Sequence, residues 1–84
     1  MKKRVFHLLA ESLGWYGVVA IVSAYAASTL GFIGPSSGVY QWLNLTGAIG
    51  IAVDAYHDRN VQPVVLNIIW AVVALIALVR GFLL

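Results

Sequence analysis

The chain has 84 residues, of which 62% are hydrophobic and only 10% are charged. A soluble domain usually contains about 45–50% apolar and about 25% charged residues, so this composition argues against a water-soluble domain and excludes intrinsic disorder. The chain has no cysteine, which excludes disulfide scaffolds, thiol catalysis and thiolate metal sites, and residues 1–84 are expected to form a single membrane domain.

The positions of the charged side chains predict the helices. Residues 12–53 and residues 60–79 carry no Asp, Glu, Lys or Arg. One membrane crossing needs about 20 apolar residues, so the first interval fits two helices and the second fits one. The turn-forming run Gly34–Gly38 divides the first interval. We therefore expect an all-α fold, a three-helix transmembrane bundle with helices over about 13–33, 38–56 and 61–82.

Small residues gather on one face of the first two expected helices. In the first helix this face includes Ser23 and Ala27, and in the second it includes Gly47 and Ala48. Small side chains let transmembrane helices approach closely, because the backbones then meet without intervening bulk. These four positions are predicted to pack between helices.

The second and third helices also carry polar side chains inside the expected membrane. Asn44 and Asn67 approach the middle of the membrane from opposite ends, where an unpaired amide is costly. Two interpretations stay open: amides beside an indole bind a polar, uncharged solute, or the amides bond to one another and hold the bundle together. The residues of this solute-binding site or interhelical polar core are Asn44, Asn67, Trp70, Tyr40 and Gln41.

The distribution of lysine and arginine predicts the orientation. Lys2, Lys3 and Arg4 precede the first helix, and Arg59 lies between the second and third helices. The loop at residues 34–38 has no basic residue, and only Arg80 lies at the far end. Basic residues favour the cytoplasmic side, so the amino terminus is expected inside the cell and the carboxyl terminus outside.

Two stretches of the sequence resemble a known family. They are PSSGVYQWLNLTGA, which begins at Pro35, and PVVLNIIWA, which begins at Pro63. The run P-S-x-x-Y-Q-x-x-N-x-x-G-A and the run P-x-x-x-N-x-x-W are similar to those of an uncharacterised, CBU-type, permease-like family of short bacterial inner-membrane proteins. The resemblance covers about residues 14–80. It implies a three-helix fold in the inner membrane and no defined activity.

A weaker resemblance is to the bacterial half-transporters related to the sugar-exporting PQ-loop proteins. Those are also three-helix units of this length, and they dimerise around a central pathway. An asparagine and a tryptophan line their solute site, and the resemblance maps these onto Asn67 and Trp70. The first helix here lacks the proline–glutamine pair of that family.

Titratable residues give little indication of catalysis. His57 lies near Asp54 and Asp58 in sequence, but a solvated charge cluster is favoured there over a metal site. His7 has Glu11 four residues further on, which is the spacing of a helical surface pair. Asp54 is a candidate for ion coupling if it faces the bundle, although exposure to cytoplasmic water is favoured. No enzyme, cofactor, metal site or nucleic-acid partner is predicted.

The functional hypotheses concern membrane association. Three short helices enclose too little volume for a pathway, so the first hypothesis is a permease-like half-transporter that forms a polar solute pathway when it dimerises. The alternative is an accessory or structural subunit that docks on a larger membrane complex. The expected partners are the lipid bilayer and either a second copy or that larger complex. The expected location is the bacterial inner membrane, with several crossings.

Overall fold

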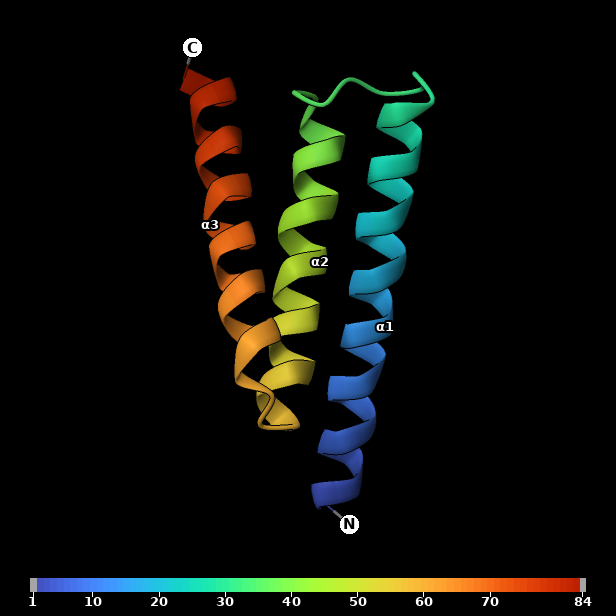
Figure 1. Ribbon diagram of the computed structural model, residues 1–84, viewed down its shortest axis with the longest axis vertical. Helices are drawn as coiled ribbons and strands as arrows, with labels where there is room; N and C mark the ends of the chain where they lie inside the picture. The colour runs from blue at the N-terminus through green and yellow to red at the C-terminus, as the bar shows by residue number, and fades with distance from the viewer. Residues whose placement is uncertain (1, 84) are drawn as a thin grey trace.

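The structure is a computed structural model that describes residues 2–83. It contains three helices, α1 (Lys2–Thr29), α2 (Gly38–His57) and α3 (Val61–Leu83), and no strand occurs within residues 2–83. Consecutive helices run antiparallel, and α2 lies between α1 and α3 (Figure 1). The predicted all-α fold with three helices is confirmed. The bounds of α2 and α3 lie within one residue of the prediction.

Helix α1 differs from the predicted range at both ends. It begins at Lys2, because the charged turns before the apolar segment continue the same helix. It ends at Thr29, because Gly31 adopts a left-handed conformation with φ 86°. The N–H of Phe32 then donates to Ala27 O at 2.8 Å, and the N–H of Gly31 donates to Ser28 O at 3.1 Å. These two bonds form a Schellman motif, which satisfies carbonyls that would otherwise lack partners.

Polar side chains fix the start of α2. Ser37 is the N-cap, and its hydroxyl accepts a hydrogen bond from the Tyr40 N–H at 3.2 Å. Gln41 donates its side-chain amide to Pro35 O at 3.0 Å, which ties the first turn of α2 to the preceding loop. The cap supplies one of the partners that the first amides of a helix need.

Helices α1 and α2 pack through glycine and alanine. An added Cβ on Gly17 would overlap the Gly47 carbonyl oxygen, and one on Gly50 would overlap the Leu13 carbonyl oxygen. The backbones therefore touch, which only small residues permit. The buried residues of α1 are Ala10, Gly14, Gly17, Ala20 and Ala24.

The four positions predicted to pack between helices differ in burial. Ser23 is exposed and Ala27 is half-buried, whereas Gly47 and Ala48 of α2 are buried. The contact face of α1 runs from Ala10 to Ala24, with buried glycines and alanines at three- and four-residue steps. Ser23 lies beside this face, next to Ala24, which is fully buried.

The three helices form an open layer, in which α1 and α3 each contact α2. No Cα–Cα distance between α1 and α3 is below 8 Å within residues 2–83. A groove near the amino-terminal end of α1 separates Phe6 and Ala10 from Val61 and Val64. Helix α2 alone holds the other two helices, since α1 contacts α2 and α3 contacts α2. Figure 1 shows α2 in the middle, with α1 and α3 on either side of it.

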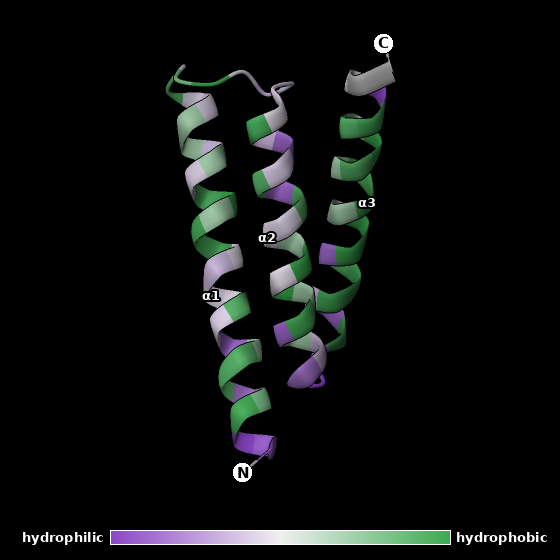
Figure 2. Ribbon diagram, turned by 180° about the vertical axis from the view of Figure 1, so that it is seen from behind, coloured by the Kyte–Doolittle hydropathy of each residue, from purple (hydrophilic) through white to green (hydrophobic). Residues whose placement is uncertain are grey.

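Two of the helices are long and apolar enough to cross a membrane. They are α1 and the α3 segment Val61–Gly81. Figure 2 shows α3 hydrophobic over most of its length, with hydrophilic residues at the amino-terminal end of α1 and the carboxyl-terminal end of α2. Helix α2 is less apolar than these two segments, because Gln41, Asn44 and Asp54 lower its mean hydropathy.

Candidate functional site

Asn44 and Trp70 connect α2 to α3. The Trp70 indole N–H donates to Asn44 Oδ1 at 2.9 Å, and Asn44 Nδ2 donates to the Tyr40 carbonyl oxygen at 2.8 Å. Asn44 is only 4% exposed, so water scarcely reaches its side chain. Its amide oxygen and its amide nitrogen each have a hydrogen-bond partner within the chain. A buried amide without partners would cost about 1–3 kcal/mol. The pair therefore satisfies the amide and holds α2 and α3 in register.

Asn67 is buried beside this pair but is not bonded to it. Its side chain is 7% exposed, and its Nδ2 donates to Pro63 O at 2.8 Å within α3. Within residues 2–83, Asn67 Oδ1 accepts no hydrogen bond. Every fully buried side-chain nitrogen or oxygen in that part of the chain does have a hydrogen-bond partner. That oxygen therefore keeps some exposure. Asn67 also lines a groove of about 390 Å³ between α2 and α3, together with Ala52, Ile68 and Ala71.

The other two predicted polar residues have local roles. Tyr40 is half-buried and takes part through its backbone, accepting from Asn44 and donating to the Ser37 hydroxyl. The Gln41 side chain turns to the loop at Pro35. The predicted set therefore divides into an Asn44–Trp70 pair, a neighbouring Asn67, and two residues that shape the start of α2.

A second polar contact joins α1 to α2. The Tyr16 hydroxyl lies 2.7 Å from Thr46 Oγ1. Thr46 donates its own proton to Trp42 O at 2.8 Å, so the tyrosine is the donor in the contact between the helices. The two residues are 30 positions apart, and no spacing rule connects them.

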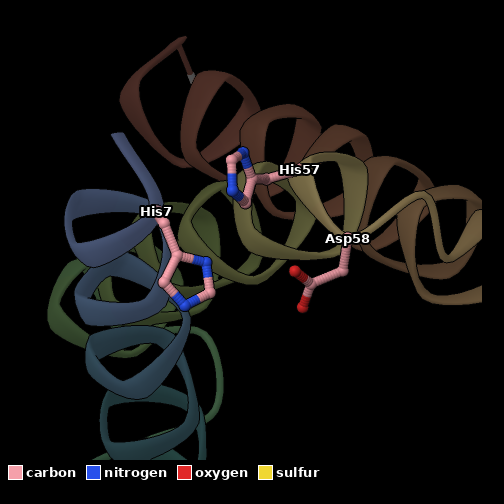
Figure 3. A group of neighbouring side chains, drawn as sticks. All are labelled: His7, His57 and Asp58. Atoms are coloured by element: carbon pink, nitrogen blue, oxygen red, sulfur yellow. The ribbon is translucent and has the colours of Figure 1, made fainter. Parts of the chain in front are cut away.

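The titratable residues gather at the end of the molecule where α1 begins and α2 ends. The rings of His7 and His57 have centroids 5.5 Å apart, and His7 Nε2 lies 3.7 Å from Glu11 Oε2. Asp58 lies beside the two histidines (Figure 3). Asp54 is half-buried, and its carboxylate lies against Gly14 of α1. All three acidic residues and both histidines of the chain thus lie in one region.

The approach of His7 to His57 is absent from the sequence prediction. That prediction pairs His7 only with Glu11, because it begins the first helix at residue 13 and leaves the preceding turns undefined. The observed α1 begins at Lys2 and carries His7 alongside the last turn of α2. The signal available in the sequence is the helical spacing of His7 and Glu11, which continues into the apolar segment.

Comparisons with known proteins place the chain in a family. A family model matches residues 10–83, so the chain belongs to that family, which is uncharacterised. No curated protein and no solved structure shows significant similarity to it. The matched region contains Asn44, Asn67, Trp70 and the cluster at the end of α2, and it begins after His7.

Proposed function

We propose that this family member is an integral membrane protein whose three helices all cross the bilayer. The support is the exposure of large apolar side chains along α1 and α3, among them Val19, Ile69 and Val73. A folded protein in water would bury such side chains, whereas lipid tails solvate them. Both helices are also long enough to span the hydrocarbon.

The case for α2 rests on its position and not on its hydropathy. It lies between α1 and α3 and packs against both, so it occupies the same depth as they do. Its polar side chains are paired within the chain, as Asn44 and Thr46 illustrate. A helix that shields its polar groups in this way can cross a bilayer with a lower mean hydropathy.

The proposed orientation has the amino terminus in the cytoplasm. Lys2, Lys3 and Arg4 lie at the same end of the layer as Arg59, and Arg80 lies at the opposite end. The positive-inside rule then favours a cytoplasmic loop between α2 and α3 and an outward carboxyl terminus. The resemblance to short bacterial membrane proteins favours the inner membrane.

Within that membrane the proposed role is that of an accessory subunit of a larger membrane complex. The observation that carries this role is the bond between Trp70 and Asn44, which consumes the polar groups that a solute site would offer. The open layer also supports the subunit role. Because α1 and α3 do not pack against each other, their apolar faces are available to the helices of other proteins.

A homodimeric half-transporter is the second candidate. It is favoured by Asn67, which lines the groove between α2 and α3 and whose side-chain oxygen keeps some exposure. An amide oxygen at the wall of a pathway would accept a hydrogen bond from a polar solute. In this case a second copy would supply the facing wall.

Cross-linking in native membranes, followed by purification in mild detergent, separates these roles. A stable association with larger membrane proteins, with no uptake of polar solutes into vesicles, is expected for the subunit. A dimer of this chain alone that takes up solute, and loses uptake in Asn67→Leu but not in Asn44→Leu, would instead establish the half-transporter.

A further inference from the structure

We propose that His7, His57 and Asp58 bind a divalent transition metal, with Zn²⁺ as the best match. One ligand atom from each of the three residues lies within 4.8 Å of the others. Figure 3 shows the two imidazoles and the carboxylate gathered between α1 and the end of α2. This site is independent of the transport and subunit roles.

The distances allow coordination after small side-chain rotations. Ligand atoms in a tetrahedral zinc site lie about 2.0–2.1 Å from the metal, which places them about 3.3 Å from one another. The present separations exceed that by no more than roughly 1.5 Å. All three side chains are exposed, so no packing prevents the rotations.

Two further carboxylates lie near the three proposed ligands. Glu11 and Asp54 line the same hollow as His7 and Asp58, and that hollow measures about 320 Å³. No lysine or arginine side chain lies within 4.0 Å of these carboxylates in the part of the chain that the structure describes. These carboxylates are therefore not held in direct ion pairs with lysine or arginine, and they are available to a divalent cation.

The carboxyl-terminal end of α2 also attracts a cation. His57 is the last residue of the helix and Asp58 is its C-cap. The carboxyl-terminal end of a helix carries partial negative charge from its terminal carbonyl groups. Two ligands are therefore fixed on one helix end, and only His7 must be supplied by a second helix.

The ligand set indicates which metal would bind. Two imidazoles and one carboxylate suit zinc and its neighbours, whereas magnesium and calcium prefer oxygen ligands alone. Three protein ligands leave one position for water or for a residue from a partner. Because His7 belongs to α1, the metal would link the start of α1 to the turn between α2 and α3.

The test is zinc titration of the full chain, without a histidine tag, in nanodiscs of zwitterionic lipid. Binding of one Zn²⁺ per chain is expected, with a rise in melting temperature at saturation. His7→Gln and His57→Gln should each weaken zinc binding by about tenfold or more, and Asp58→Asn should weaken it less. The same ranking is expected with Co²⁺, read from its visible absorption.

Gln62→Ala is the matched control, because Gln62 is an exposed polar residue at the same end of the molecule and lies outside the cluster. It should bind zinc as the unmodified chain does. Helical content measured by circular dichroism checks that each variant is folded. Absence of saturable zinc binding by the unmodified chain would overturn the proposal. So would zinc binding that the His7→Gln, His57→Gln double variant retains in full.

Discussion

Gly17 of α1 and Gly47 of α2 face each other, each directed at the other's carbonyl oxygen. A Cβ on Gly47 would lie 3.0 Å from Gly17 O, and a Cβ on Gly17 would overlap Gly47 O. The hydrogen in each of those directions therefore points at an oxygen, which is the arrangement of weak Cα–H···O contacts between helices. Because both neighbours are backbone atoms, neither can move aside for a side chain.

Gly17→Ala should consequently destabilise the protein. The added methyl group would force α1 and α2 apart, and we expect a loss of about 1–3 kcal/mol in the free energy of unfolding. Gly81→Ala is the control, because nothing lies within 4 Å of a Cβ at that helical position. It should be neutral or stabilising by up to about 1 kcal/mol, as alanine favours a helix over glycine. Denaturant unfolding in mixed micelles measures both.

Gly47→Leu and Ser23→Leu compare two predicted packing positions, of which the structure buries the first and exposes the second. The first substitution places bulk against Ile21, Gly17 and Ala20, so stability should fall by more than about 2 kcal/mol. Ser23 is exposed, and its replacement should change stability by less than about 0.5 kcal/mol. Equal losses for the two variants would show that Ser23 is also a packing position.

The contact between Asn44 and Trp70 makes a double-mutant cycle possible. Asn44→Leu leaves the indole N–H without its partner, so it should cost more with Trp70 present than with Trp70→Phe. We expect a coupling free energy of about 0.5–1.5 kcal/mol, which is the range for hydrogen bonds between membrane helices. Asn67→Leu should show no coupling to Trp70, because these residues share no hydrogen bond. If the Asn44 and Trp70 substitutions change the free energy of unfolding additively, the hydrogen bond between these residues would be contradicted.

Arg59 has a left-handed backbone with φ 57°, in a turn where the Asn60 N–H donates to Ala55 O at 2.8 Å. Such a conformation is unfavourable for a residue with a Cβ and is open to glycine. Arg59→Gly should therefore raise the free energy of unfolding by about 0.5–1 kcal/mol. Asn60→Gly, at a neighbouring position without a positive φ, should lower it. Thermal unfolding of both variants checks the difference in sign.

Charge spacing and turn signals predict three helices and the bounds of α2 and α3, because an uncharged interval of fixed length has few other solutions. The end of α1 is harder to predict from the sequence, since a glycine at position 31 stops a helix only if its backbone adopts a positive φ. Gly47, Ala48 and Asn44 lie on one face at helical spacing, and the structure buries all three.

The contacts between α1 and α2 could not be predicted in the same way. Tyr16 meets Thr46 because α1 packs against α2 in one particular register, and His7 meets His57 because α1 also extends back to Lys2. That register is set by backbone contact at Gly17 and Gly47, a tertiary effect that hydropathy does not encode. The open layer likewise depends on packing geometry and not on composition.

Site-directed labelling can show whether α2 crosses the membrane between the crossings of α1 and α3. The chain has no cysteine, so single cysteines can be introduced without background. Ser36→Cys and Gln62→Cys place an exposed thiol at opposite ends of α2. In intact spheroplasts, a membrane-impermeant maleimide should label Ser36→Cys at once and Gln62→Cys only after lysis. Labelling of both positions from the same side would show that α2 does not cross, and would contradict the proposed topology.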